Sequence, residues 1–173
     1  MIKIEPATEA HSQILAMLGR ITYTESHGDF IKDRNDLLRY NDQAFSISRT
    51  KRDLSDKQNL FFIAYQSGFP VGYAKLMLNQ THASIASKNA CRLDKIYILN
   101  EFLPLKIGQV FLEFLEAKVQ ELGLNTIWLA TYIKNFRAIR FYEKNQYAAV
   151  GKLDFSVNGT AYENIVFSKR LEL

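Results

Sequence analysis

Residues 93–142 constrain the fold of this chain most, because their apolar spacing changes from the period of a strand to that of a helix. Residues 96–99 form a short apolar run that is typical of a strand. From residue 107 onwards the apolar side chains share one helical face, and they are Ile107, Val110, Phe111, Phe114, Leu115, Val119 and Leu122. A helix that starts directly after a turn presents several backbone N–H groups without intrahelical partners. We therefore expect the turn before Ile107 to be able to bind an anion.

A second strand and a second helix follow in the same stretch. Gly123 suits the left-handed conformation that commonly ends a helix, and residues 126–131 (TIWLAT) predict a strand. Asn135 opens the amphipathic segment NFRAIRFYEK, which predicts the second helix. The order strand, turn, helix, strand, helix indicates a cofactor site near the turn.

This arrangement resembles the GCN5-related N-acetyltransferase family. The resemblance rests on a strand that ends in IYIL, a turn that ends in glycine at a helix start, a further strand, and the motif Asn-x-x-Ala-x-x-Phe-Tyr from Asn135 to Tyr142. It covers nearly the whole chain, strongly in residues 65–147 and loosely before residue 59, and is closest to the spermine/spermidine acetyltransferase branch. It implies a single domain over residues 1–173 with an α+β (mixed α/β) fold, in which helices pack on both faces of a mostly antiparallel sheet of about seven strands.

In the family, this turn carries the pattern Gln/Arg-x-x-Gly-x-Gly/Ala and binds the pyrophosphate of acetyl-CoA through backbone amides. Here the pattern falls on Leu103, Pro104, Leu105, Lys106, Ile107 and Gly108, and only the last glycine matches. Lys106 stands at the first glycine, and Pro104 has no N–H to donate. The Lys106 ammonium could supply charge-assisted hydrogen bonds to the pyrophosphate, or its side chain could obstruct the phosphate. Both interpretations stay open.

The strand over residues 91–99 carries an irregularity. Its alternation of apolar and polar residues slips between Asp94 and Ile96, and a β-bulge is one physical cause of such a slip. An ordinary buried strand fits the pattern equally well. In the resembled family this strand is bulged and its backbone bonds the pantetheine arm. The resemblance therefore implies that the residues in contact with acetyl-CoA, besides those of the turn, are Ile96, Tyr97, Ile98, Gln109, Asn135 and Ala138.

Acetyl transfer from a thioester to an amine needs a neutral amine, a polarised carbonyl and a proton for the departing thiolate. The resemblance implies that Tyr142 is the general acid, and a phenol suits this role because it holds its proton at neutral pH. The alternative is an aromatic residue packed at a helix end. The resemblance implies that Asp94 is the general base, with a salt bridge to Arg92 or Lys95 as an equal alternative.

The acceptor contacts are implied by the resemblance alone. In the family, the segment after the first helix lines the acceptor pocket, and in this chain that segment (residues 22–30) contains Tyr23, Glu25, His27 and Asp29. Its carboxylates would suit a cationic amine. Without the resemblance, the same residues indicate a polar surface loop in which the helical period breaks at Thr22.

The remaining elements follow from apolar period and turn residues. They are a strand at residues 2–5 that stops at Pro6, a helix after Thr8 with a weak point at Gly19, a short helix within 33–45, a polar surface helix or loop at 47–58, a hairpin of 60–65 with 71–78, a loop at 79–89, and a final hairpin of 147–154 with 162–168.

Composition excludes several classes of protein. Hydrophobic residues make up 47% of the 173, which predicts a folded globular chain. Cys91 is the only cysteine and the three histidines are scattered, so we expect no disulfide, no metal site and a reducing compartment. The start, MIKIEPATEA, lacks a signal-peptide pattern and no apolar run approaches membrane-spanning length, so we expect a cytoplasmic protein without a membrane partner. The net charge of +4 is scattered, which makes a nucleic-acid partner an unfavoured interpretation.

The resemblance implies an enzyme, an N-acetyltransferase that moves an acetyl group from acetyl-CoA to a primary amine, either a polyamine or another small amine. Acetyl-CoA is the acyl-donor substrate, and a homodimer is an open option. One alternative is a CoA-binding module of the same fold with little or no turnover, which the residues Leu103, Pro104 and Lys106 favour. The other is a nucleic-acid-binding protein, which only the charge favours.

Overall fold

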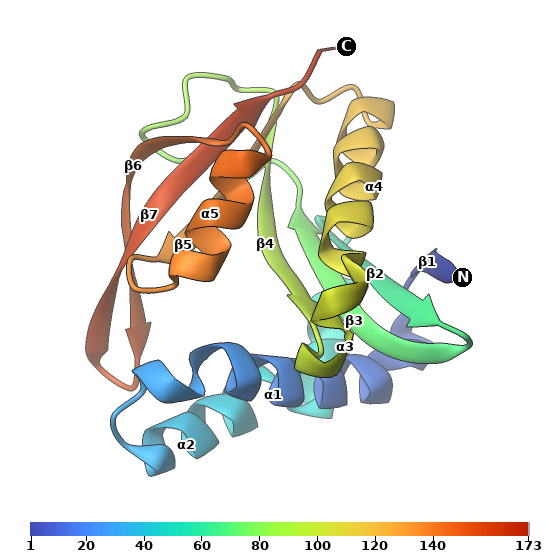
Figure 1. The fold of residues 1–173 in the computed structure, drawn as a ribbon, viewed down its shortest axis with the longest axis vertical. Helices are drawn as coiled ribbons and strands as arrows, with labels where there is room; N and C mark the ends of the chain where they lie inside the picture. Colours follow the sequence, from blue (N-terminus) through green and yellow to red (C-terminus); the bar gives the residue numbers. More distant parts are fainter. Residues whose placement is uncertain (173) are drawn as a thin grey trace. The chain divides into compact units, whose positions relative to one another are not determined.

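The structure is a computed structural model that describes residues 1–172. Its elements, in chain order (Figure 1), are β1 (Ile2–Pro6), η1 (Glu9–His11), α1 (Ser12–His27), η2 (Gly28–Phe30), α2 (Arg34–Ala44), α3 (Ile47–Ser55), β2 (Asn59–Gln66), β3 (Phe69–Met77), β4 (Ala90–Ile98), η3 (Asn100–Leu105), α4 (Ile107–Glu121), β5 (Thr126–Tyr132), α5 (Phe136–Lys144), β6 (Ala148–Val157) and β7 (Thr160–Arg170).

Within residues 1–172 the strands form one seven-stranded sheet in the order β1-β2-β3-β4-β5-β7-β6. The pairs β1/β2, β5/β7 and β6/β7 are antiparallel, whereas β4/β5 is parallel. A parallel pair needs a long connection, and the segment with η3 and α4 supplies it. The predicted mixed, mostly antiparallel α/β fold is confirmed.

The chain divides into two compact units. Unit 1 comprises Met1–Leu76 and Lys95–Phe114, and unit 2 comprises Met77–Asp94 and the chain from Leu115 onwards. Strand β4 and helix α4 therefore each contribute to both units.

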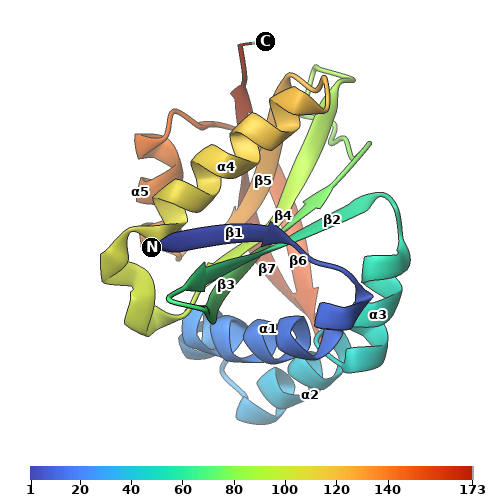
Figure 2. The same cartoon turned by 90° about the vertical axis from the view of Figure 1, so that its right-hand side faces the viewer.

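In unit 1, helix α1 contacts both α2 and α3, as Figure 2 shows. Leu15 and Leu18 of α1 pack on Phe61, Ile63 and Tyr73 of the sheet to form a buried core. The predicted weak point at Gly19 has a packing reason. A Cβ at this position would lie 2.3 Å from Cδ1 of Phe45, so only glycine allows this close approach.

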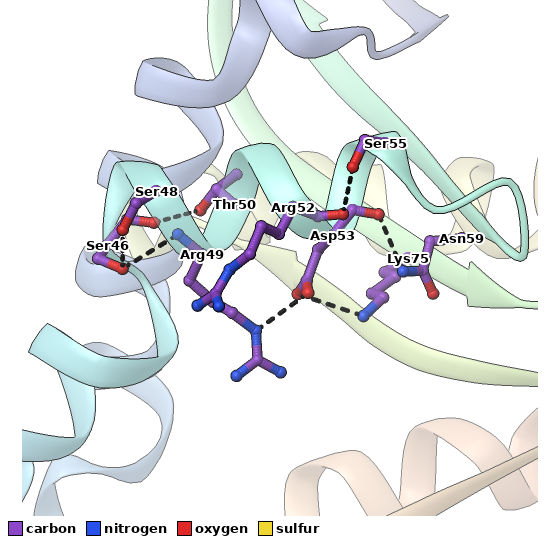
Figure 3. A network of polar contacts seen from close by, with 9 residues as sticks. All are labelled: Ser46, Ser48, Arg49, Thr50, Arg52, Asp53, Ser55, Asn59 and Lys75. Atoms are coloured by element: carbon purple, nitrogen blue, oxygen red, sulfur yellow. Dashed lines mark hydrogen bonds and ion pairs between the residues drawn. The ribbon is translucent and has the colours of Figure 1, made fainter.

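Helix α3 is polar in sequence, and polar contacts hold it in place (Figure 3). The hydroxyl of Ser46 caps its start by accepting a hydrogen bond from the Arg49 N–H at 3.2 Å. The carboxylate of Asp53 accepts from Nε of Arg49 at 3.0 Å and lies 3.6 Å from the ammonium of Lys75 on β3. The side-chain amide of Asn59 donates to the backbone carbonyl of Asp53 at 2.9 Å. These contacts connect α3 to β2 and β3.

The expected break of the first helix at Thr22 is wrong, because α1 continues to His27. The hydroxyl of Thr22 is buried and donates to the carbonyl of Leu18 at 2.6 Å, so the polar side chain is satisfied inside the helix. Tyr23 is also buried and packs against the ring of Tyr40. Tertiary packing therefore overrides the local break in period.

In unit 2, β5 pairs with β7 from Thr126–Arg170 to Tyr132–Asn164, and β6 pairs with β7 as a hairpin. The hairpin turn places Asn158 and Gly159 at φ 46° and 85°, which matches the type I′ turns of two-residue hairpins. Helix α5 packs against β7 through the rings of Tyr142 and Phe167, whose centroids lie 6.2 Å apart (Figure 1).

Candidate active site

The candidate cofactor turn, residues 103–108, contains a residue in the left-handed region. Lys106 has φ 55° and ψ 27°, a left-handed conformation that glycine adopts without strain and that other residues enter at a cost of about 1–2 kcal/mol. Lys106 is the residue that the resemblance aligns with the first glycine of the family pattern. It therefore adopts a conformation that suits glycine, and its side chain is exposed.

The start of α4 follows directly. Ile107 is the first residue of this fifteen-residue helix and is fully buried, which anchors the helix start in unit 1. The Gln109 N–H donates to the carbonyl of Lys106 at 3.0 Å, and the Gln109 side chain donates to Glu113 at 2.8 Å. Pro104 lies in η3, so its missing N–H does not reduce the number of donors at the start of α4. The turn offers the oriented amides and positive dipole end that bind phosphates.

The second half of β4 also lies in unit 1. Ile98 is buried, and the Tyr97 ring contacts Tyr73 at 5.9 Å between centroids. A Cβ at Gly72 of β3 would lie 2.5 Å from the Tyr97 carbonyl oxygen, so this glycine lets the two strands approach closely.

The first half of β4 belongs to unit 2 and pairs with β5. Their parallel ladder runs from Ala90–Thr126 to Arg92–Trp128, and among the described residues 1–172 it has no pair beyond Arg92. β5 itself continues to Tyr132 along β7. The ladder therefore ends just before the predicted slip between Asp94 and Ile96, which fits the splayed strand that the resemblance implies.

The structure brings together three of the four candidate acceptor residues with candidate cofactor elements in unit 1. The rings of Tyr23 and His27 stack at 4.6 Å, and His27 meets Tyr97 edge-on at 6.0 Å. The carboxylate of Glu25 accepts a hydrogen bond from the Asn100 N–H at 2.9 Å, at the start of η3. Glu25 therefore anchors the segment that leads into the 103–108 turn.

The fourth candidate, Asp29, lies exposed in η2. Tyr23, by contrast, is only 4% exposed, which leaves little of its surface for a ligand.

A hollow in unit 1 was not predicted. It is open to solvent and has an accessible volume of about 20 Å³, room for about one water molecule. Its lining combines Lys75, Lys95 and Asp53 with the apolar residues Leu15 and Phe61. The sequence feature that could have indicated this hollow is Lys75, a single charge within the apolar strand VGYAKLML. Lys75 is 6% exposed and its ammonium lies 5.4 Å from the centre of the Phe61 ring, a cation–π contact.

In unit 2, the candidate acid Tyr142 lies in the last turn of α5. It is 8% exposed, and its ring packs against Tyr147 at 5.6 Å and Phe167 at 6.2 Å. Burial raises the pKa of the Tyr142 phenol above its ordinary value, so the group stays protonated throughout the neutral range. The side-chain oxygen of Asn135 accepts from the Ala138 N–H at 3.2 Å and caps the helix.

The candidate base Asp94 forms an ion pair with Arg92, in which the guanidinium Nη2 lies 3.3 Å from the carboxylate. A salt bridge to Arg92 or to Lys95 was the predicted alternative to a role of Asp94 as general base, and the structure contains the pair with Arg92. The Arg92 guanidinium also lies over the Trp128 ring at 5.2 Å.

Within residues 1–172 no group of three or more His, Cys, Asp or Glu side chains could hold a metal ion. In the same range no helix has the length and apolar character needed to cross a membrane.

The strand order, the helix start after β4 and the Asn135-capped helix agree with the order of elements on which the family resemblance rests. Residues 22–147 match the sequence profile of the Acetyltransferase (GNAT) family. The chain therefore belongs to the Acetyltransferase (GNAT) family, as the resemblance predicted, and the predicted enzyme class is confirmed.

The chain is similar to relatives across nearly its whole length. It is 23% identical to an uncharacterized N-acetyltransferase in the pepI 3' region of Lactobacillus delbrueckii subsp. lactis, over 90% of this chain and 86% of that one. The PaiA N-acetyltransferase of Thermoplasma acidophilum, solved in complex with coenzyme A, aligns with a TM-score of 0.75 at 19% identity, over 98% of this chain and 99% of that one. The ribosomal-protein-S18-alanine N-acetyltransferase of Escherichia coli aligns with a TM-score of 0.72 at 15% identity, over 100% and 96% of the two chains. At these identities the structural likeness shows the fold.

Proposed function

We propose that this protein transfers the acetyl group of acetyl-CoA to the primary amine of a small molecule, a polyamine or another small amine, by direct attack. The observation that carries the proposal is the left-handed backbone of Lys106 directly before α4. It supports productive cofactor binding, because a left-handed residue in a turn can orient successive backbone amides toward an anion. The exposed ammonium of Lys106 adds a positive charge at the same place.

In this proposal the contacts with acetyl-CoA are those that the family resemblance implies. The backbone of the 103–108 turn and Gln109 bind the pyrophosphate, and the strand backbone bonds the pantetheine arm. Asn135 and Ala138 add contacts from the start of α5. The residues assigned to acetyl-CoA are Ile96, Tyr97, Ile98, Leu103, Pro104, Leu105, Lys106, Ile107, Gly108, Gln109, Asn135 and Ala138.

Tyr142 acts as the general acid. The amine nitrogen attacks the thioester carbonyl carbon, the carbon–sulfur bond breaks, and the departing thiolate takes the phenol proton. The burial that raises the Tyr142 pKa keeps this proton in place before the reaction. A raised pKa also lowers the driving force for donation, so transfer is favourable only as negative charge develops on the sulfur.

Asp94 acts as the general base through water and takes the proton that the attacking amine loses. Its side chain is 12% exposed and its carboxylate is paired with Arg92. The Arg92 guanidinium therefore lies beside the oxygen atoms that would accept the proton.

The acceptor approaches the C-terminal end of α1 in this proposal. Glu25 and Asp29 are exposed there, and their negative charges would attract a cationic amine. His27 and Tyr23 provide aromatic surface beside them. The likeness to the spermine/spermidine branch is the reason to test polyamines first, and it stays a prediction.

A CoA-binding module with little or no turnover is the second candidate. Lys106 and Pro104 depart from the family pattern, and the Arg92–Asp94 ion pair gives Asp94 a structural role. These observations would suit a protein that binds the cofactor without releasing its thiol.

We also propose that residues 1–173 act as one acetyltransferase domain in a reducing, cytoplasmic setting. The family match spans residues of both units, which supports this. Cys91 is buried, as expected for a thiol that forms no disulfide. A homodimer stays an open option.

Two measurements test the function. Isothermal titration calorimetry with acetyl-CoA should show binding that Gly108→Trp weakens strongly, because the indole would meet the phosphates. A thiol-release assay across polyamines, amino acids and other primary amines should identify a turned-over acceptor. Binding of acetyl-CoA without thiol release with any acceptor would favour the CoA-binding module. Unchanged affinity for acetyl-CoA in a folded Gly108→Trp variant would show that the cofactor binds elsewhere.

A further inference from the structure

Unit 2 contains a polar cluster that the proposed reaction does not use. The carboxylate of Glu116 on α4 accepts a hydrogen bond from the Tyr147 hydroxyl at 3.0 Å. The ammonium of Lys169 on β7 bonds both carboxylate oxygens, at 3.0 and 2.9 Å, and lies 5.6 Å from the centre of the Tyr147 ring. The side chains of Glu116 and Lys169 are 17% and 20% exposed, and Tyr147 is 3% exposed.

This cluster holds Tyr147 at two points. The hydroxyl is bound by Glu116, and the Tyr147 N–H donates to the Tyr142 carbonyl at 3.0 Å. Burial and the charge of Glu116 raise the pKa of Tyr147, so its hydroxyl remains a donor at every usable pH. The orientation of the Tyr147 ring is therefore determined by hydrogen bonds as well as by packing.

The fixed ring in turn contacts Tyr142. The two ring centroids lie 5.6 Å apart with the planes at 64°, and Phe167 contacts the Tyr142 ring at 6.2 Å. Edge-to-face contacts between aromatic rings depend on geometry, so a shift of one ring is passed to the other.

Stability alone does not explain such a cluster. Desolvating a carboxylate and an ammonium is costly, and apolar residues of similar volume often stabilise a fold as well or better. A fully bonded polar network instead specifies one arrangement of its members. The arrangement that this network specifies includes the ring beside Tyr142.

We propose that Glu116, Lys169 and Tyr147 are positioning residues that orient Tyr142 for proton transfer. The proposal rests on the proposed function, in which Tyr142 is the general acid. None of the three residues is assigned a contact with substrate, so they act through the Tyr142 ring.

The first test compares two Tyr→Phe variants in unit 2, using acetyl-CoA and an acceptor that the wild type turns over. Tyr147→Phe keeps the ring and removes the hydroxyl, and kcat should fall ~10-fold, because small displacements of a reacting group are costly in rate. KM for acetyl-CoA should stay within ~2-fold, because no cofactor contact is removed. Tyr162→Phe, on β7 beside Tyr132, is the matched control and should keep wild-type kcat.

A double variant shows whether Tyr147 acts through Tyr142. If it does, Tyr147→Phe should slow the wild type but should not slow Tyr142→Phe any further. An equal fall in both backgrounds, or wild-type kcat in folded Tyr147→Phe, would overturn the proposal. Wild-type turnover in Tyr142→Phe alone would refute the general acid instead, so the two failures are distinguishable.

An apolar version of the cluster separates positioning from folding. The triple variant Glu116→Leu, Lys169→Met, Tyr147→Phe removes every polar group of the cluster and leaves no buried charge unpaired. It should unfold at a temperature no lower than that of Tyr147→Phe, yet show the same loss of kcat. Recovery of wild-type kcat in the triple variant would show that the network serves stability only, and this result decides the question even if Tyr147→Phe folds poorly.

Discussion

The backbone conformation of Lys106 and the charge of its side chain have separate effects, and two substitutions distinguish them. The backbone of Lys106 is left-handed, and the Lys106 ammonium stands at the proposed pyrophosphate site. Lys106→Ala removes the charge but keeps a Cβ in the left-handed conformation. Lys106→Gly removes the charge and relieves the backbone as well.

The expected stability difference follows from the observed φ of 55°. Relief of the left-handed conformation stabilises the glycine variant by about 1–2 kcal/mol. The greater freedom of glycine in the unfolded chain costs about 0.4–1 kcal/mol. Lys106→Gly should therefore be more stable than Lys106→Ala by about 0.8 kcal/mol, the difference between the midpoints of these two ranges. For a chain of this size that corresponds to about 1.5–3 °C in Tm.

The binding effect should be the same in both variants. A lost hydrogen bond to a charged group costs about 1.5–3 kcal/mol, so Kd for acetyl-CoA should rise about 10- to 150-fold. Raising the salt concentration should reduce the difference in Kd between each variant and the wild type, because salt screens the interaction of the exposed ammonium with the phosphates.

Thermal unfolding and titration calorimetry on wild type and both variants provide the measurements. Equal stability of the glycine and alanine variants would refute the left-handed backbone at residue 106. Tighter binding of acetyl-CoA by either variant would show that the lysine side chain obstructs the phosphate instead of compensating for the missing glycine.

Three further predictions follow from single residues. Tyr142→Phe should lower kcat by ~10²–10⁴-fold with little change in acetyl-CoA affinity, and thiol release at the wild-type rate would make Tyr142 a packing residue. Gly19→Ala places a Cβ against Phe45 and should destabilise the fold by about 1–3 kcal/mol in urea unfolding, whereas an unchanged midpoint would mean that the Phe45 ring moves aside. Burial raises the pKa of Cys91 to about 12, so its thiol should react with a disulfide reagent at neutral pH only after denaturant is added; rapid labelling of the native protein would contradict this burial.

The order and type of most elements could be predicted from the sequence because local signals agree there. The apolar period over residues 107–122 predicted α4, Gly123 ends its last turn with φ 72°, and Asn135 caps α5. Each of these signals acts over a few residues and needs no distant partner.

The family resemblance located the candidate site residues, but their surroundings could not be predicted. The sequence left open whether Asp94 forms a salt bridge, and the structure shows Arg92 beside it. Whether α1 continues past Thr22 depends on burial of Tyr23 among rings from other elements. The apolar period of residues 22–30 carries no information on contacts with distant residues. The break in that period at Thr22 therefore indicated a loop.

Tertiary structure alone decided two features of the candidate site. A lysine has no local preference for the left-handed region, and Lys106 adopts it because η3 and the buried start of α4 are both anchored in unit 1. Glu116 is 31 residues from Tyr147 and 53 residues from Lys169 in the sequence. The three side chains meet only when α4, β7 and the segment after α5 pack together. Local sequence determined the order and type of most helices and strands. Packing determined which side chains surround Tyr142, because a buried hydrogen bond exists only once both of its partners have been brought out of water.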